Sequence, residues 1–178
     1  PSNLRRSSIH SLDIISRIKT QNIGFHMNLL FLCKANMFRS QIAEAWYNHL
    51  SRKNKATSAA LIAHEGELSW LVTKSSKEFG LDLKKQYSKK VTNAMIKKAD
   101  IIVIMNENLK ESFSKYKNII KPSAIIEIWN ISDIVVKDSN KKIYPEFVKA
   151  CEIIRNRISA GGNEGIWRGS RDGLAGQG

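Results

Sequence analysis

The chain has 178 residues, of which 42% are hydrophobic and 25% are charged, as in a single globular domain with its own core. No apolar run approaches the roughly 20 residues that a membrane-spanning helix needs, and no signal-peptide pattern follows Arg5 and Arg6. We therefore expect no membrane association and a cytoplasmic location.

The formal net charge is +13, from 29 Lys and Arg against 16 Asp and Glu. Such a balance suits nucleic acid, an anionic surface or an anionic substrate. The lysines are scattered and no DNA- or RNA-binding motif is present, so we expect no nucleic-acid partner. Nothing in the sequence indicates an oligomeric state.

The chain contains two cysteines, Cys33 and Cys151, too few for a disulfide framework. In an intracellular protein this count favours one functional thiol and one packing residue. No His/Cys cluster has the spacing of zinc ligands. We expect neither a metal nor another cofactor.

The two ends of the chain differ from its middle. Residues 1–26 show only a weak helical pattern before a sharply apolar run begins at Met27. We predict that residues 1–26 are an N-terminal extension, weakly ordered or appended, and that residues 27–160 form the domain. Residues 161–178 are rich in Gly and bury too little apolar surface to offset their ordering entropy. A flexible tail is expected there.

Between the ends, short apolar runs alternate with segments of helical periodicity. In chain order the pattern predicts a strand at residues 28–32, a helix at 40–50, a strand at 56–61, helices at 68–79 and 92–99, a strand at 100–105, a helix at 107–116, a strand at 123–129 and a helix at 144–158.

Strict alternation implies a parallel sheet with helices on both faces, and right-handed crossovers leave few topologies. We predict an α/β fold with a doubly wound, four-stranded parallel sheet of the flavodoxin-like type. Ligands bind such sheets beyond the carboxyl ends of the strands. The loop after the first strand, which begins at Cys33, is therefore the expected site.

The residues of this loop suit an anion site; they are Cys33, Lys34, Ala35, Asn36, Met37, Phe38, Arg39 and Ser40. N–H groups at the start of the next helix lack internal partners, and with the loop amides they form a nest for phosphate. Arg39 adds a planar fork for two phosphate oxygens. The same field favours the thiolate form of Cys33, and Ser40 can donate a hydrogen bond to it. A cysteine that ends an apolar strand is more often a packing residue, but the flanking strand, helix and serine favour function.

The motif Cys33-Lys-Ala-Asn-Met-Phe-Arg39-Ser40, within residues 27–50, resembles the start of the low-molecular-weight protein tyrosine phosphatases. That superfamily also contains thioredoxin-coupled arsenate reductases and protein arginine phosphatases. Residues 57–60, 64–67, 99–105 and 129–133 resemble later family segments in the same order. The resemblance covers residues 27–159.

The resemblance implies a phosphate-monoester hydrolase, namely a protein tyrosine phosphatase with a phosphocysteine intermediate. Cys33 would attack phosphorus, and Arg39 would bind the equatorial oxygens in the transition state. Asp133 would protonate the leaving phenolate and then activate water, with Asp138 as the fallback acid. The implied substrate is a phosphorylated protein or an aryl phosphate.

The resemblance also implies supporting roles around this loop. Asn36 would hold the loop in an unusual backbone conformation with help from Ser58, and Ser40 would stabilise the thiolate. Residues 34–40 would bind the phosphate.

The chain departs from the family pattern in ways that bear on its substrate. Ile134 and Val135 follow Asp133 where many members carry an aromatic residue, which weakens the case for phosphotyrosine. Trp70 and Tyr87 are other possible sources of aromatic surface, with a core role favoured for Trp70. Other differences are Ala35 for glycine, Phe38 for a second cysteine, Gln41 for proline, Gln86 for a loop-supporting histidine and Asn106 for aspartate.

Three alternatives remain open. An arsenate reductase would need an external thiol, because no further cysteine follows the third strand except Cys151 in the final helix. An arginine phosphatase is less favoured, since Met37 stands where that type has threonine. A non-catalytic phosphate-binding module would keep the loop but make no use of Asp133.

Overall fold

In the computed structural model, the described residues are 27–51, 55–62, 66–68, 70–133 and 140–159. The predicted extension at residues 1–26 and the predicted tail at 161–178 lie outside them, as do Ile134, Val135 and Asp138. The side chain of Trp70 is likewise not described.

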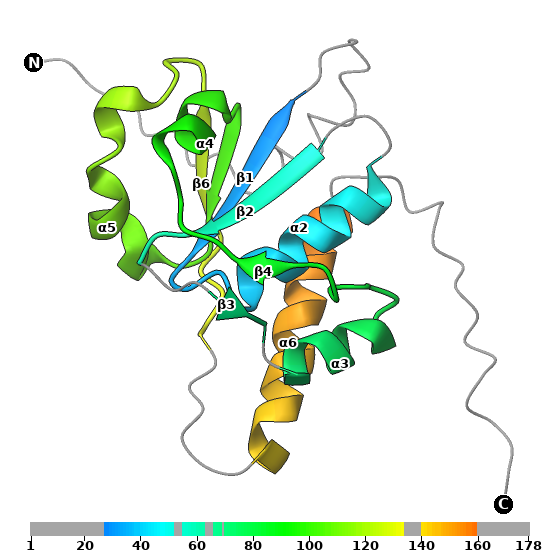
Figure 1. The fold of residues 1–178 in the computed structure, drawn as a ribbon. Helices are drawn as coiled ribbons and strands as arrows, with labels where there is room; N and C mark the ends of the chain where they lie inside the picture. Colours follow the sequence, from blue (N-terminus) through cyan, green and yellow to red (C-terminus); the bar gives the residue numbers. More distant parts are fainter. Residues whose placement is uncertain (1–26, 52–54, 63–65, 69, 134–139, 160–178) are drawn as a thin grey trace, which may run out of the picture.

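The predicted sheet is confirmed. Strands β1 (Asn28–Cys33), β2 (Lys55–Ala60), β5 (Ile101–Ile104) and β6 (Ile125–Ile128) form a four-stranded sheet in the order β2-β1-β5-β6. All pairs are parallel. The chain therefore winds from β1 outward to β2 and then back across β1 to β5 and β6, which is the doubly wound pattern (Figure 1).

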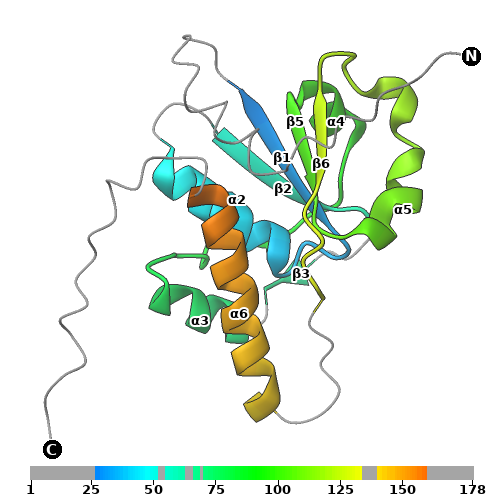
Figure 2. The ribbon, with the colours of Figure 1, turned by 180° about the vertical axis from the view of Figure 1, so that it is seen from behind.

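Helices cover both faces of this sheet (Figures 1 and 2). One face carries α2 (Arg39–Leu50), α3 (Trp70–Glu78) and α6 (Asn140–Ser159). The other carries α4 (Asn93–Lys98) and α5 (Lys110–Ser114). None of the helices in the described residues is long and apolar enough to cross a membrane.

Side chains alternate between the two faces of the central strands, and they therefore belong to two separate hydrophobic cores. In β1, Leu29, Phe31 and Cys33 belong to the cluster shared with α2 and α6, whereas Leu30 and Leu32 belong to the cluster shared with α4 and α5. Both faces of the strand are buried, which explains its unbroken apolar run. Each such side chain contributes roughly 1.5–3 kcal/mol on burial.

Two predicted helices differ in detail. The segment at 107–116 is not one helix but a 3-10 turn, η1 (Glu107–Leu109), followed by α5, and a second 3-10 turn, η2 (Lys117–Ile119), comes next. The side chain of Asn106 accepts from the N–H of Asn108 at 2.9 Å, which favours a tight turn at this point. The final helix begins at Asn140 rather than 144, so it includes Pro145 inside its length.

A small antiparallel ribbon was not predicted. Strands β3 (Gly66–Glu67) and β4 (Tyr87–Ser88) pair with each other and not with the main sheet. Two residues are too few to show a strand period in sequence. The ribbon matters because it brings Tyr87, Ser88 and Lys89 against the loop that follows β1.

Candidate active site

The loop between β1 and α2 lies at the carboxyl edge of the sheet. β1 ends at Cys33 and α2 starts at Arg39. The first backbone bond of the helix runs from the N–H of Ile42 to the carbonyl of Phe38 at 3.0 Å. The N–H groups of residues 39–41 therefore precede the intrahelical ladder, as expected for a helix start that can bind an anion.

Cys33 lies at the base of this loop and is 3% exposed. Its Sγ accepts from the backbone N–H of Asn36 at 3.1 Å and lies 3.0 Å from Ser40 Oγ. Hydrogen bonds to a charged sulfur are stronger than those to a neutral thiol. Two hydrogen-bonding groups thus converge on the sulfur of Cys33.

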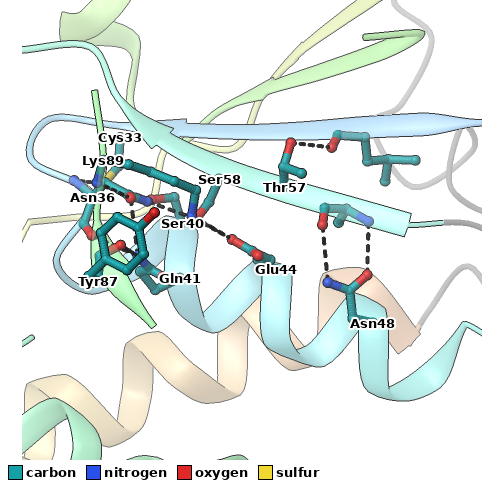
Figure 3. A network of polar contacts seen from close by, with 12 residues as sticks. Cys33, Asn36, Ser40, Gln41, Glu44, Asn48, Thr57, Ser58, Tyr87 and Lys89 are labelled. Atoms are coloured by element: carbon teal, nitrogen blue, oxygen red, sulfur yellow. Dashed lines mark hydrogen bonds and ion pairs between the residues drawn. The ribbon is translucent and has the colours of Figure 1, made fainter. Parts of the chain in front are cut away.

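Asn36 is the hub of the hydrogen bonds that shape the loop (Figure 3). Its φ is 53°, in the left-handed region, which costs an ordinary L-residue roughly 1–2 kcal/mol. Its Nδ2 donates to Ser40 Oγ and Ser58 Oγ, both at 2.8 Å. Its Oδ1 accepts from Gln41 Nε2 at 3.1 Å and from the N–H of Lys89 at 3.0 Å. The side chain therefore uses both donors and both acceptor sites.

These bonds fix the direction of the hydroxyl hydrogens. Because Asn36 donates to both serines, each hydroxyl hydrogen is left for another acceptor. Ser58 donates to Glu44 Oε2 at 2.5 Å, and Glu44 is paired with Lys89 Nζ at 3.5 Å. The hydroxyl of Ser40, 3.0 Å from the sulfur of Cys33, can donate its hydrogen to a thiolate there.

Arg39 joins the loop to the segment after β6. Its side chain is 3% exposed, its Nη1 donates to the carbonyl of Ile131 at 2.8 Å, and its Nη2 lies 2.9 Å from Asp133 Oδ2. Asp133 is 50% exposed. The N–H of Ile131 bonds to the carbonyl of Met105 at 2.8 Å, which continues the β5–β6 pairing into this segment. The sheet thus carries Asp133 to Arg39.

The remaining loop residues divide between surface and core. Lys34 is exposed, and the carbonyl of Ala35 accepts from Ser88 Oγ at 2.6 Å. Phe38 stacks on Phe147 of α6 with ring centroids 4.6 Å apart, and Met37 packs against the same core. Met37 and Phe38 can therefore contribute their backbone N–H groups to a phosphate while their side chains serve packing.

Several residues of the network were not singled out as site residues from sequence, namely Gln41, Glu44, Ser88 and Lys89. Gln86, which aligns with the family's loop-supporting histidine, bonds through its N–H to Leu83, and within the described residues it has no hydrogen bond to the loop. Gln41 does reach the loop. A sequence feature that could have indicated Gln41 is its place as a polar residue beside Ile42, on the buried side of an amphipathic helix.

Cys151, in contrast to Cys33, has the features of a packing residue. It lies on α6 with 0% exposure, in the same core cluster as Cys33. Burial raises the pKa of its thiol to about 12, so it stays protonated at neutral pH. Among the described residues, no group of three His, Cys, Asp or Glu side chains could hold a metal ion.

The chain is similar to known proteins both in sequence and in fold. The family model described as low molecular weight phosphotyrosine protein phosphatase matches residues 28–159. The tyrosine phosphatase amsI of Erwinia amylovora superposes with a TM-score of 0.65 at 18% identity, over 76% of this chain and 91% of that chain. A low molecular weight protein tyrosine phosphatase from T. tengcongensis gives a TM-score of 0.60 at 25% identity, over 75% and 96%.

Curated relatives point to a second activity in the same superfamily. Proteins named arsenate reductase from Halalkalibacterium halodurans and Bacillus subtilis are 33% and 35% identical over 78 residues. Each match covers 43% of this chain and 55% of the relative, so the chain spans little more than half the length of these relatives.

Proposed function

This chain belongs to the low molecular weight phosphotyrosine protein phosphatase family, and from that premise we propose that it hydrolyses phosphate monoesters through a phosphocysteine intermediate. The proposed substrates are phosphotyrosine in proteins or another aryl phosphate. One observation carries the proposal. A buried arginine fork, Arg39, lies between the loop of Cys33 and the carboxylate of Asp133.

Binding would use groups that are already in place. The phosphate dianion would occupy the loop, with the backbone N–H groups of residues 34–40 and the guanidinium of Arg39 as donors. Nη2 of Arg39 now pairs with Asp133. The dianion would take over that nitrogen and release the Asp133 carboxyl toward the leaving oxygen.

The chemistry would proceed in two displacements. Cys33 thiolate attacks phosphorus, the bond to the leaving oxygen breaks, and Asp133 gives its proton to that oxygen. Asp133 then takes a proton from water, whose oxygen attacks phosphorus as the S–P bond breaks. The sulfur departs as a thiolate, stabilised by the Ser40 hydroxyl and the Asn36 N–H.

The test is hydrolysis of p-nitrophenyl phosphate in the presence of a chelator by the wild type, Cys33→Ser and Cys151→Ala. We expect turnover by the wild type and Cys151→Ala and none by Cys33→Ser. Acid-quenched wild-type protein should carry a phosphoryl group on the Cys33 peptide. A folded wild type without turnover, or an active Cys33→Ser, would contradict the proposal.

A second candidate is arsenate reduction, which the named curated relatives favour. Cys33 would attack arsenate and release water, leaving a cysteine–arsenate adduct. Two external thiols would then supply the electrons, forming a disulfide and releasing arsenite, because the other cysteine, Cys151, is buried. The test compares the rate of arsenite release, with thioredoxin or glutathione as the electron donor, with the rate of aryl phosphate hydrolysis. A higher rate of arsenite release would favour this activity.

The same protein variants can also test two further hypotheses, an arginine phosphatase and a non-catalytic binding module. Faster cleavage of phosphoarginine than of phosphotyrosine would indicate an arginine phosphatase. The chain resembles solved arginine phosphatases in fold. A loop that binds phosphate without turnover, and for which Asp133→Ala changes nothing, would indicate a non-catalytic binding module.

A further inference from the structure

We propose that Gln41 is a positioning residue for the phosphate loop, which acts through Asn36 to keep the loop amides and Cys33 converged on one anion. The inference rests on the proposed function to the extent that this loop is taken as the phosphate site. It concerns how that site is held.

The contacts of Gln41 require a donor at this position. Gln41 is 0% exposed, on the first turn of α2. Its Nε2 donates to the carbonyl of Asn36 at 3.2 Å, to Asn36 Oδ1 at 3.1 Å and to the carbonyl of Tyr87 at 2.8 Å. Backbone carbonyls accept only, and the Oδ1 of Asn36 also receives the N–H of Lys89. The three oxygens around Nε2 all act as acceptors, so the group that fits at this position is a donor.

The other half of the Gln41 amide supports the same conclusion. Its Oε1 is buried and has no hydrogen-bond partner among the described residues. A buried unpaired acceptor destabilises a protein, and an apolar residue of similar size would avoid that cost. The donor half of Gln41 is thus the part that the fold requires.

Gln41 joins elements that are distant in sequence (Figure 3). It ties the first turn of α2 to the loop and to β4 of the small ribbon. Without it, the carbonyl of Asn36 loses this donor in a buried position, and the left-handed conformation of Asn36, with φ of 53°, loses one of its supports.

The effect reaches Cys33 through the orientation of the Asn36 amide. The Nδ2 of Asn36 donates to Ser40 and Ser58 because its Oδ1 is engaged by Gln41 and by the N–H of Lys89. If the amide turned over, its oxygen would face both hydroxyls, and Ser40 would donate to Asn36 instead of to the sulfur. Gln41 therefore helps to set the hydrogen-bond polarity at Cys33.

Two substitutions separate hydrogen bonding from size. Gln41→Glu keeps the shape but replaces the donor with an acceptor, and Gln41→Met removes both polar halves. The matched control is Asn48→Leu on the same helix, since Asn48 makes a pair of bonds to Ala56 far from the loop, at 2.8 and 3.1 Å. It should lower stability comparably without touching Asn36.

The measurement is the rate at which iodoacetate alkylates Cys33, followed by mass spectrometry against pH, with and without inorganic phosphate. We expect both Gln41 variants to need about tenfold or more phosphate for equal protection. The loss in Gln41→Glu should shrink as pH falls, because the introduced carboxyl regains a donor on protonation. Asn48→Leu should keep the wild-type profile and protection.

Two results would overturn the inference. One is a folded Gln41→Met protein whose alkylation profile and phosphate protection match the wild type within about twofold, a difference too small for a lost buried hydrogen bond. The other is an Asn48→Leu protein that shows the same losses, which would reduce the effect to general stability. Because alkylation and phosphate binding need no turnover, failure of the proposed phosphatase activity would appear separately, as a wild type that is protected by phosphate yet hydrolyses nothing.

Discussion

At the scale of single residues, two groups compete for the guanidinium of Arg39: the carboxylate of Asp133 and the proposed phosphate. The carboxylate lies 2.9 Å from Nη2, and the proposed phosphate needs the same nitrogen. Arg39 keeps its bond to the carbonyl of Ile131 in either case. Asp133 is half exposed, so water screens the pair and its exchange for a dianion costs little.

This arrangement predicts that Asp133→Ala changes binding and turnover in opposite directions. Turnover of an aryl phosphate with a poor leaving group should fall about 10²–10⁴-fold, because the leaving oxygen departs unprotonated. Inorganic phosphate should bind about two- to tenfold more tightly, because its competitor for Arg39 is gone. Steady-state kinetics with phosphate as inhibitor measures both, and weaker phosphate binding in the variant would contradict the competition.

Most of the site residues proposed from the sequence belong to one contiguous motif, and Ser58 and Asp133 were proposed from later segments that resemble the family. Cys33, Asn36, Arg39 and Ser40 have fixed spacing because a strand, a tight loop and a helix leave little freedom between them. Gln41 acts on backbone carbonyls and on the side chain of Asn36. Of these partners, the carbonyl of Tyr87 is brought to Gln41 by the ribbon, whose position no local pattern encodes.

At the scale of elements, the loop after β1 depends on a residue that tolerates positive φ and also bonds through its side chain. Asn36→Gly keeps the backbone freedom and loses the side-chain network, whereas Asn36→Ala loses both. We expect Asn36→Ala to be less stable than Asn36→Gly by about 1 kcal/mol, because alanine meets the steric cost of the left-handed region. Urea denaturation of the two variants measures the difference, and equal stabilities would argue against a strained loop.

Strand β6 carries a buried acid that makes its own prediction. Glu127 is 5% exposed, and its Oε2 accepts from Trp129 Nε1 at 2.9 Å. Burial raises the pKa of Glu127 above its ordinary value of 4.5, although the bond from Trp129 and the charge of Arg157 act in the opposite direction. The folded protein therefore keeps this proton to a higher pH than the unfolded chain does.

The contribution of Glu127 to stability is greatest below pH 4.5 and declines as pH rises toward the folded pKa. Glu127→Gln keeps an acceptor for Trp129 but cannot ionise. The free energy of unfolding of the wild type, measured relative to this variant by urea denaturation, should fall as pH increases above 4.5. Parallel pH profiles for the two proteins would show that Glu127 does not carry the effect.

The main elements were predictable because each holds a long enough apolar pattern. β1 and β5 are buried on both faces and read as unbroken apolar runs. The ribbon of β3 and β4 was missed because two residues per strand show no period. The segment at 107–116 kept helical spacing of its apolar residues, while the Asn106 side chain imposed a tight turn at its start.

At the scale of the whole molecule, the two cores lie on opposite faces of the sheet and bear differently on the site. Phe147 of α6, 1% exposed, stacks on Phe38 of the loop and belongs to one core. Phe113 of α5, 6% exposed, belongs to the other core. Either side chain truncated to alanine should cost about 3–5 kcal/mol.

These two truncations should differ at the active site. Phe147→Ala removes the support under Phe38, so phosphate should protect Cys33 from alkylation less well than in the wild type, by about tenfold. Phe113→Ala should lose similar stability and keep wild-type protection, measured below its unfolding transition. Equal protection in both variants would show that α6 supports the fold without tuning the loop.

The order of the site residues along the chain determines when the site can be completed during translation. The groups that bond to the side chain of Asn36 belong to residues between Ser40 and Lys89. Asp133, which pairs with Arg39, and α6, which backs Phe38, leave the ribosome much later. Strand β5, which pairs with β1 on the side opposite to β2, ends at Ile104. A nascent chain that has emerged only this far contains the residues of the anion cradle but neither the proposed acid nor the helix that backs Phe38, so the site is completed only after α6 has emerged.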